Sequence, residues 1–376
     1  MLNVGLCGLG TVGKGVYDII VNNPYFKEKF CIKKILVASL DKKRDVDTSL
    51  LTNNYKDIVN DSSIDIVIEL IGYEELAKKI IVESLNNKKD VVTANKALLA
   101  KDLDLFLQLS KLNNKHIYFE ASVCGAIPII DLILKINNSD KILKIEGILN
   151  GSTNYILTKI NEGKSFNSAK EEAYLNGFLE ADPSDDLKGF DALRKIIILS
   201  KLAYKSKFEI DNIKSIPMDN LTDSIINYLK ENNYVVKYIA RSILINNKIE
   251  IEVMPCALLS SDIFANINNE MNIVRLDTTY SKNITISGYG AGRFPTASAV
   301  MLDLDKILKN EYYNLDFSNN FEIESLTKSS YLIDSDIELD NDYILKKSNN
   351  IYLTKPITYD TLNNILRYAK CAVKIN

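Results

Sequence analysis

The sequence contains no tryptophan and only one histidine, His116, among its 376 residues. One histidine cannot build a zinc site that needs several histidine ligands. A Ser-His-Asp or Cys-His catalytic arrangement would have to use His116 itself. If this protein is an enzyme, the sequence therefore predicts that its acid–base groups are Lys, Asp, Glu or Tyr.

Cysteine is sparse, and membrane-type sequence is lacking. Cys7, Cys31, Cys124, Cys256 and Cys371 are odd in number and have no CxxC spacing, which predicts a reduced, cytoplasmic protein. No apolar run is long enough to span a bilayer. The first residues, MLNVGLCGLG, lack the basic region of a signal peptide and predict a buried strand.

Charge of one sign is not in excess either. The formal net charge is −3, so no basic surface points to nucleic acid or to anionic lipid. Hydrophobic residues make up 46% and charged residues 25%, as in ordinary globular proteins. The length predicts two or three domains. The charge and the lack of long apolar runs predict no nucleic-acid or membrane partner.

Short apolar runs in the first 140 residues predict a parallel sheet. They are rich in Val and Ile and mostly continuous, as in strands that are buried on both faces. The predicted strands are Asn3–Cys7, Lys34–Ala38, Asp65–Leu70, Asp90–Thr93 and Ile117–Ala121, and the predicted helices are Thr11–Val21, Glu75–Asn87 and Asp102–Asn114. This alternation predicts an α/β fold with an N-terminal Rossmann-type sheet domain at residues 1–135.

The pattern changes after about residue 140. The predicted strands are Ile145–Leu149, Val235–Ile245, Ile249–Met254 and Asn283–Ser287, and the predicted helices are Ser152–Glu162, Asp186–Tyr204 and Pro295–Leu308. We expect a mostly antiparallel sheet with helices on one face, forming an α+β domain at 136–294. A helix at about 295–310 is expected to complete the first domain.

A glycine-rich motif, Gly8-Leu9-Gly10-Thr11-Val12-Gly13, follows the first predicted strand and opens the first predicted helix. In such a motif the first glycine permits a tight turn, the second lets a pyrophosphate approach the backbone, and the third lets the helix pack on the strand. The helix N-terminus offers free N–H groups to phosphate. We interpret the motif as a dinucleotide-binding loop; a glycine-rich turn without a ligand is the alternative.

The end of the second strand leaves the cofactor open. Asp41 could bind the ribose hydroxyls of NAD, whereas Lys42, Lys43 and Arg44 could bind the 2′-phosphate of NADP. A solvated basic loop explains the three cations equally well. The sequence therefore predicts NAD or NADP without deciding between them.

Three further segments carry candidate chemistry. Lys96 follows a predicted parallel strand, where ligands bind in open α/β sheets, although a surface lysine at a helix start is the simpler reading. Asp191 and Lys195 share a helix face beyond an acidic segment. They could place a proton donor beside carboxylates that capture a substrate ammonium, or form an exposed salt bridge.

Residues 288–299, GYGAGRFPTASA, could be a second cofactor contact or an interdomain crossover.

Taken together, the sequence closely resembles the homoserine dehydrogenase family from residue 1 to about 310. The segments that carry the resemblance are GLGTVG, VVTANKALLA, FEASVCGAIPII, ILNGSTNYIL, GFLEADPSDDLKGFDALRK and GYGAGRFPTASAV. The resemblance implies reversible NAD(P)-dependent interconversion of L-homoserine and L-aspartate 4-semialdehyde, on the route from aspartate to threonine and methionine. It also implies a homodimer whose substrate-binding and dimerisation region is the α+β domain.

By position, the resemblance implies roles for individual residues. The implied catalytic residues are Lys195, Lys96 and Asp191. The implied substrate-binding residues are Gly151, Ser152, Glu180 and Asp186. The implied cofactor-binding residues are Gly8, Gly10, Thr11, Val12, Gly13, Gly72, Thr93, Lys96 and Gly292. The implied ligands of a monovalent cation, sodium or potassium, are Glu120, Val123, Gly125 and Ile127, mainly through carbonyl oxygens.

Lysines suit this reaction without a histidine. A lysine ammonium can protonate the aldehyde oxygen and take the proton back in the oxidative direction. Which of Lys96 and Lys195 is the proton donor stays open.

The sequence departs from the family at several positions. Tyr73 replaces the second glycine of the usual Gly-Gly, and Leu40 replaces an arginine that favours NADP. Ser152 replaces the usual threonine but keeps the hydroxyl. Phe178 replaces a tyrosine of some members, which would remove one substrate hydrogen bond. Cys124-Gly125-Ala126 replaces Ala-Gly-Gly in the cation segment.

The region 320–376 is too short for a complete ACT domain, the βαββαβ regulatory domain in which many bacterial members end. Ile351–Pro356 and the helix Tyr359–Tyr368 resemble its final part, and Ser330–Asp336 is the candidate first strand. The Asp-x-Pro-Gly turn of the usual effector-binding helix is missing. We expect a truncated, ACT-like region that mainly supports the dimer, with weak or absent threonine feedback.

Two other functions remain as alternatives. One is a related semialdehyde oxidoreductase on the same two-domain plan. The other is a non-catalytic dinucleotide-binding regulator. A regulator would have no reason to keep Lys96, Asp191 and Lys195 together, which argues against it.

Overall fold

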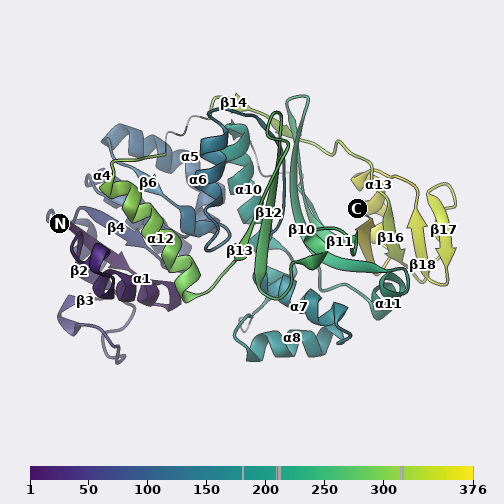
Figure 1. Ribbon diagram of the computed structural model, residues 1–376, viewed down its shortest axis with the longest axis horizontal. Coiled ribbons are helices and arrows are strands. Elements are labelled where there is room, and N and C mark those ends of the chain that lie inside the picture. The colour runs from purple at the N-terminus through teal and green to yellow at the C-terminus, as the bar shows by residue number, and fades with distance from the viewer. Residues whose placement is uncertain (180–181, 209, 211–212, 314, 316, 376) are drawn as a thin grey trace. The chain divides into compact units, whose positions relative to one another are not determined.

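The computed structural model describes residues 1–179, 182–208, 210, 213–313, 315 and 317–375. The chain forms two compact units (Figure 1). The first consists of residues 1–134 and 290–316, and the second of residues 135–289 and 317–376. In the described part of the chain, no helix is both long and apolar enough to cross a membrane.

The first unit contains the expected parallel sheet. Its strands are β1 (Leu2–Cys7), β2 (Phe30–Leu36), β3 (Leu51–Thr52), β4 (Ile66–Glu69), β5 (Asp90–Thr93) and β6 (Ile117–Tyr118). They follow the order β3-β2-β1-β4-β5-β6, and every neighbouring pair is parallel. This order is that of a doubly wound dinucleotide-binding sheet, so the prediction of a Rossmann-type fold is confirmed.

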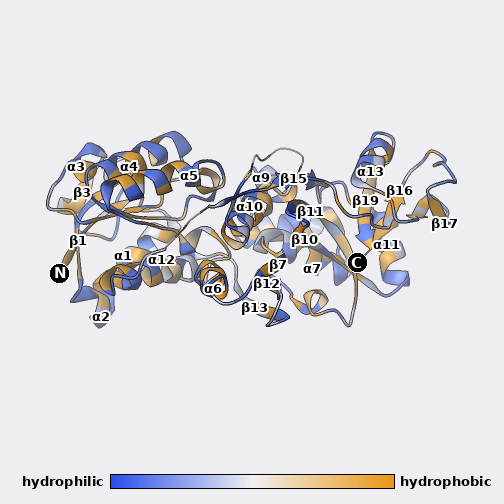
Figure 2. Cartoon of the chain, turned by 90° about the horizontal axis from the view of Figure 1, so that it is seen from above, coloured by the Kyte–Doolittle hydropathy of each residue, from blue (hydrophilic) through white to orange (hydrophobic). Residues whose placement is uncertain are grey.

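Helices lie on both faces of this sheet (Figure 2). They are α1 (Thr11–Asn22), α2 (Pro24–Lys27), α3 (Lys56–Val59), α4 (Glu74–Asn86), α5 (Lys96–Asn113) and α12 (Arg293–Leu308), and α6 (Ile129–Ile136) leads into the second unit. Helix α4 packs on α5, and α1 packs on α12. Gly15 permits the close contact with α12, because a Cβ there would lie 2.8 Å from the oxygen of Arg293.

Three elements of the first unit differ clearly from their expected ranges. Strand β2 covers Phe30–Leu36 rather than Lys34–Ala38. Helix α5 begins at Lys96 rather than Asp102, because the side chain of Asn95 accepts a hydrogen bond from Leu98 N (3.2 Å) and caps a run of good helix formers. Strand β6 ends at Tyr118, and a short 3-10 helix (Glu120–Ser122) follows it.

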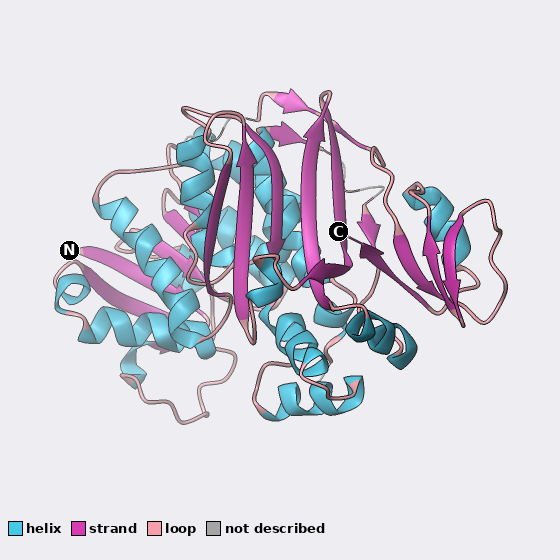
Figure 3. Cartoon of the chain, turned by 45° about the vertical axis from the view of Figure 1, so that its right-hand side comes forward, coloured by secondary structure: helices cyan, strands magenta, loops and turns pink. Residues whose placement is uncertain are grey.

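The second unit is built on an eleven-stranded sheet, whose long strands are visible in Figure 3. Its strands are β7 (Ile142–Ile148), β9 (Lys214–Ser215), β10 (Tyr234–Ile245), β11 (Lys248–Leu259), β12 (Met271–Thr278), β13 (Asn283–Tyr289), β15 (Glu322–Ile323), β16 (Tyr331–Asp334), β17 (Ile344–Ser348), β18 (Ile351–Thr354) and β19 (Cys371–Ile375); β8 (Ser206–Lys207) pairs separately with β14 (Asn319–Asn320). The order β13-β12-β7-β10-β11 is antiparallel throughout, as expected. Strand β12 is absent from the predicted strands; it forms because β7 and β13 pair with its two edges.

Helix α9 and helix α10 replace the single helix expected over residues 186–204. The helices of this unit are α7 (Gly151–Asn161), α8 (Phe166–Leu175), α9 (Ser184–Leu187), α10 (Phe190–Tyr204), α11 (Asp223–Glu231) and α13 (Tyr359–Leu366), with a 3-10 turn at Phe264–Asn266. The break falls at Gly189, which has a φ of +83°. A Cβ there would lie 2.2 Å from the hydroxyl of Tyr238. As a result, Asp186 and Asp191 lie on different helices.

The strands after residue 330 continue the same sheet (yellow in Figure 1). Their order is β11-β19-β16-β18-β17, and α13 connects β18 to β19. The described segment 335–343, between β16 and β17, contains no helix. Helix α11, from the middle of the chain, packs on β16 and β18 instead. The ACT-like character of this region stays a prediction.

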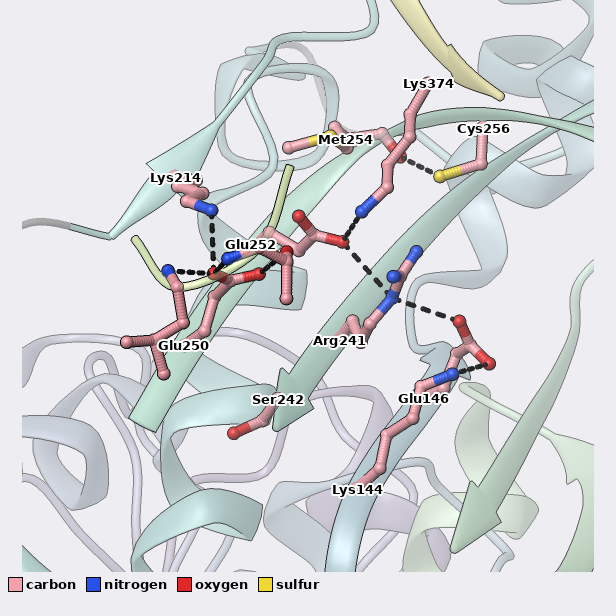
Figure 4. Close-up of polar contacts among 12 residues, drawn as sticks. Lys144, Glu146, Lys214, Arg241, Ser242, Glu250, Glu252, Met254, Cys256 and Lys374 are labelled. Atoms are coloured by element: carbon pink, nitrogen blue, oxygen red, sulfur yellow. Dashed lines mark hydrogen bonds and ion pairs between the residues drawn. The ribbon is translucent and has the colours of Figure 1, made fainter. Parts of the chain in front are cut away.

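Charged side chains form a row across one face of the sheet (Figure 4). Arg241 on β10 places Nε 3.1 Å from Glu146 Oε1 on β7 and 3.1 Å from Glu252 Oε1 on β11. Lys144 and Lys374 each pair with one of these carboxylates, at 2.9 Å and 2.5 Å. The two glutamates are almost fully buried. Each buried charge therefore faces an opposite charge on a neighbouring strand, as burial of ions requires.

Candidate active site

The glycine-rich loop lies at the carboxyl end of β1. Gly8 has a φ of +103°, and a Cβ there would lie 2.6 Å from a backbone oxygen. A Cβ on Gly13 would lie 2.0 Å from the oxygen of Gly8, so α1 packs directly on the loop. At Gly10, by contrast, a Cβ would meet nothing within 4 Å. The loop thus leaves open space at Gly10, directly before Thr11 and Val12, where the helix N-terminus can receive a phosphate.

A cavity of about 420 Å³ opens beside this loop. Its lining includes Gly8, Gly10, Gly72, Lys42 and Arg44. Arg44 is held by hydrogen bonds from Nη1 to Ser39 O (2.7 Å) and to Lys42 O (2.9 Å). Asp41 and Lys43 are not part of the lining. Two of the three candidate cations therefore face the cavity, and the candidate acid does not.

A buried carboxyl, that of Glu69 at the end of β4, connects two loops at this edge of the sheet. It accepts hydrogen bonds from Thr93 Oγ1 (2.6 Å) and from Ile71 N (2.6 Å). The Thr93 hydroxyl in turn accepts one from Asn95 N (3.0 Å), directly before Lys96. Burial raises the pKa of Glu69 to about 7. Glu69 therefore holds the chain on which the predicted residues Thr93 and Lys96 lie.

In the second unit, Asn150 lies where the chain leaves β7 and enters α7. Its side-chain oxygen accepts a hydrogen bond from Thr153 N (2.8 Å) and caps the helix. Its Nδ2 donates to Asp186 Oδ1 (2.7 Å) and to Asp191 Oδ2 (2.8 Å). Sequence reasoning assigned no role to Asn150, although an asparagine before a helix start is a recognisable capping signal.

Lys195 and Asp191 form a buried ion pair one turn apart on α10. Lys195 Nζ lies 2.7 Å from Asp191 Oδ2 and donates to Leu149 O at 2.7 Å. The two residues are 8% and 5% exposed, so the alternative of an exposed salt bridge is wrong. An ammonium has three N–H donors, and these two oxygens fix its direction.

Gly151 and Ser152 form the first turn of α7. A Cβ on Gly151 would lie 2.7 Å from the oxygen of Glu270, so the backbone here is closely packed. Ser152 Oγ donates to Phe178 O at 2.6 Å. Glu180, the second predicted ligand of the substrate ammonium, lies outside the described residues.

The predicted cation segment is the loop between β6 and α6. Its predicted ligands are Glu120, Val123, Gly125 and Ile127. The Glu120 carboxylate is buried and accepts hydrogen bonds from Ile130 N (2.8 Å) and Asp131 N (3.0 Å); burial raises its pKa to about 7. Among the described residues, no group of three or more His, Cys, Asp or Glu side chains is arranged to hold a metal ion. The carbonyl oxygens of this loop stay the predicted cation ligands.

The predicted site residues fall into two groups, one in each unit. In the second unit Asn150 donates to Asp186 and Asp191, Asp191 pairs with Lys195, and Gly151 and Ser152 directly follow Asn150 in the chain. In the first unit Gly8, Gly10 and Gly72 line one cavity, while Lys96 opens α5 and Gly292, with a φ of +121°, precedes α12. Sequence reasoning missed Asn150 and Glu69. Nothing in the sequence near Glu69 distinguishes it from an ordinary residue at a strand end.

Comparison with known proteins gives one family. The family model described as homoserine dehydrogenase matches residues 128–304, and the one described as homoserine dehydrogenase, NAD binding domain, matches residues 8–120. The homoserine dehydrogenase of Bacillus subtilis is 40% identical over 317 residues, covering 82% of this chain and 73% of that protein. That of Pseudomonas aeruginosa is 32% identical over 314 residues, covering 82% and 72%.

Solved structures agree with this result. A homoserine dehydrogenase from Thiobacillus denitrificans superposes with a TM-score of 0.87 at 27% identity, covering 100% of this chain and 98% of that one. A hyperthermophilic archaeal homoserine dehydrogenase in complex with NADPH has a TM-score of 0.71 at 26% identity, covering 83% and 99%.

Proposed function

The chain belongs to the homoserine dehydrogenase family of NAD(P)-dependent oxidoreductases, and from this premise we propose that it interconverts L-homoserine and L-aspartate 4-semialdehyde through Lys195 and the residues around it. The observation that carries the proposal is the buried Lys195 ammonium, fixed by Asp191 and by Leu149 O. A non-catalytic regulator has no use for a lysine held in this way. The reaction belongs to the route from aspartate to threonine and methionine.

The first unit would hold the cofactor. The open space at Gly10 fits a pyrophosphate, and Gly72, Thr93, Lys96 and Gly292 lie at strand ends and helix starts of the same unit. When bound, the nicotinamide would supply the carbon that accepts or returns the hydride. Its chemistry needs no other redox group from the protein.

NADP is the cofactor that we propose as preferred. Lys42 and Arg44 line the cavity, and their positive charges suit a 2′-phosphate, whereas Asp41 is not part of the lining. The NADPH complex of the archaeal relative supports the same choice. NAD is the alternative, because the arginine usual for the family is Leu40 here.

The second unit would hold the substrate. Asp186, together with Glu180, would bind the ammonium group on carbon 2. The hydroxyl of Ser152 and the backbone of Gly151, at the N-terminus of α7, would contact the polar groups of the substrate. The hydrogen bond from Ser152 to Phe178 O fixes the direction of this hydroxyl.

Lys195 would move the proton at the oxygen on carbon 4. In the reductive direction its ammonium donates a proton to the carbonyl oxygen as negative charge develops there. In the oxidative direction the neutral amine removes the proton of the hydroxyl group. Asp191 and Leu149 O hold Nζ in place, so that little reorganisation is needed in the transition state. Lys96 is the second lysine of this proposal, and its charge would orient the substrate.

A monovalent cation, sodium or potassium, is proposed at the carbonyl oxygens of Glu120, Val123, Gly125 and Ile127. Rates in sodium, potassium and choline chloride at constant ionic strength test this site. Equal rates in all three salts would contradict the cation site.

We also propose a homodimer, to be checked by light scattering. The five free cysteines suit the reducing cytoplasm proposed as its location.

The reaction itself is tested by mixing the purified protein with L-homoserine at alkaline pH and following the absorbance of reduced nicotinamide, with NADP and NAD in parallel. We expect turnover, and faster turnover with NADP at low cofactor concentration. A folded protein that binds the dinucleotide but does not turn over would favour the regulator instead.

A further inference from the structure

The side-chain amide of Asn150 connects three parts of the proposed substrate site. Its oxygen accepts from Thr153 N in α7, and its nitrogen donates to Asp186 Oδ1 in α9 and to Asp191 Oδ2 in α10. All three contacts are 2.7 to 2.8 Å long. The orientation of the amide follows from its partners, since the carboxylates need a donor and the backbone N–H needs an acceptor.

Two carboxylates therefore share one neutral NH₂ group. Asp186 and Asp191 carry like charges and lie on helices that Gly189 separates. Like charges held close together repel each other, and a group that donates to both can set their separation. The two N–H bonds of an amide point in different directions, which suits them to two acceptors at once.

The same oxygen of Asp191 also accepts from Lys195. Lys195 Nζ and Asn150 Nδ2 lie 2.7 Å and 2.8 Å from Asp191 Oδ2. Lys195 in turn donates to Leu149 O, the residue next to Asn150. One N–H of Asn150 therefore binds the carboxylate that holds Lys195, the proposed proton donor. The other N–H binds Asp186, the proposed ligand of the substrate ammonium.

We propose that Asn150 is a positioning residue that sets the distance between the ammonium-binding carboxylate of Asp186 and the Asp191–Lys195 pair. The inference rests on the proposed function. The substrate carries its ammonium on carbon 2 and its reacting oxygen on carbon 4, so the separation of the two protein groups decides whether both ends are bound together. Misplacement by about 1 Å costs on the order of 100-fold in rate.

Two variants separate the two roles of Asn150: the bridge, in which its NH₂ group binds Asp186 and Asp191, and the helix cap, in which its oxygen binds Thr153 N. Asn150→Ser keeps a good capping oxygen for Thr153 N but has no NH₂ group, whereas Asn150→Ala loses both. We expect the serine variant to be more stable to heat than the alanine variant, because only serine keeps the cap. We expect activity to follow the bridge: both variants raise KM for L-homoserine and lower kcat, with kcat/KM reduced at least tenfold, while KM for the dinucleotide changes less than twofold.

A serine variant with wild-type kcat and KM would overturn the proposal and show that Asn150 acts only as a helix cap. An inactive wild-type protein, measured in parallel, would instead contradict the proposed function, and the inference on Asn150 with it. If the serine variant does not fold, Asn150→Thr also keeps a capping oxygen, has no NH₂ group and carries the same comparison. A double-mutant cycle with Asp186→Asn completes the test: the two changes should be non-additive in KM, and additive effects would contradict the bridge.

Discussion

Lys374 on β19 and Glu252 on β11 form an ion pair of 2.5 Å although each side chain is only 3% exposed. Glu252 also faces Arg241 at 3.1 Å, within the row of charges in Figure 4. The pair lies where β19 runs parallel to β11. This pair links the strands after residue 330 to the central sheet by opposite charges.

Removal of this lysine charge should destabilise the protein strongly. Lys374→Met leaves the Glu252 carboxylate buried with one cation fewer, which costs about 3 kcal/mol of unfolding free energy. Urea unfolding measures the change. The matched control is Lys347→Met, whose partner Glu338 lies at 3.2 Å in an exposed pair, 48% and 77% exposed; it should lose no more than about 1 kcal/mol. Equal losses in the two variants would show that burial of the first pair is unimportant.

Lys195→Arg should fold and lose turnover. Arginine keeps the positive charge beside Asp191 but cannot give up its proton near neutral pH. We expect kcat for homoserine oxidation to fall about 10²- to 10⁴-fold. Thermal melting checks that the variant is folded, and Lys188→Arg, at an exposed position near α10, is the control. Unchanged turnover would remove Lys195 from the proton transfer, and Lys96→Arg would then be expected to show the loss.

Arg44→Ala should weaken binding of NADP and leave NAD unaffected. Arg44 lines the cavity beside the glycine-rich loop, where a 2′-phosphate would be bound by charge-assisted hydrogen bonds. We expect KM for NADP to rise about tenfold, which corresponds to about 1.4 kcal/mol. Lys43→Ala, which lies outside the cavity lining, is the matched control. Similar changes in KM for both cofactors would argue against recognition of the 2′-phosphate by Arg44.

Glu69 should make stability depend on pH. Its pKa of about 7 in the folded protein lies above the ordinary value of 4.5, because the carboxyl is buried. Between these two values the unfolded chain releases a proton that the folded protein keeps, so the contribution of Glu69 to stability is full below pH 4.5 and is lost as the pH rises through about 7.

Glu69→Gln removes this contribution, since glutamine resembles the protonated acid. Between pH 4.5 and 7.5 we expect the wild type to lose about 3 kcal/mol more unfolding free energy than the variant. Urea unfolding at a series of pH values measures the difference. Glu171→Gln, at an exposed position on α8, should follow the wild type. Parallel curves for Glu69→Gln and the wild type would contradict the assignment.

Local sequence patterns predicted the elements that depend on a few neighbouring residues. The glycine spacing from Gly8 to Gly13 predicted the turn and helix start after β1, and the spacing of Asp191 and Lys195 predicted that they share a helix face. The continuous apolar runs predicted the parallel sheet. Each of these patterns lies within one turn or one strand, where backbone geometry decides the outcome.

The sequence patterns did not predict contacts between residues that are far apart in the sequence. Asn150 binds carboxylates that come 36 and 41 residues later, and no local pattern specifies such a pairing. The helix expected over 186–204 breaks at Gly189, which has a φ of +83°, and Tyr238, far along the chain, occupies the space where a Cβ would lie. Strand β12 forms because of its two neighbours in the sheet.

The sequence by itself determined the fold class, the dinucleotide loop and the residue types available for proton transfer, because these follow from composition, period and spacing. Only the tertiary structure decided that Lys195 is a buried, directed ammonium rather than a surface charge. It also decided that Lys42 and Arg44, but not Asp41, face the cavity, and that one asparagine holds two carboxylates. Burial and hydrogen-bond direction arise from packing, and packing depends on residues that the chain brings together from far apart.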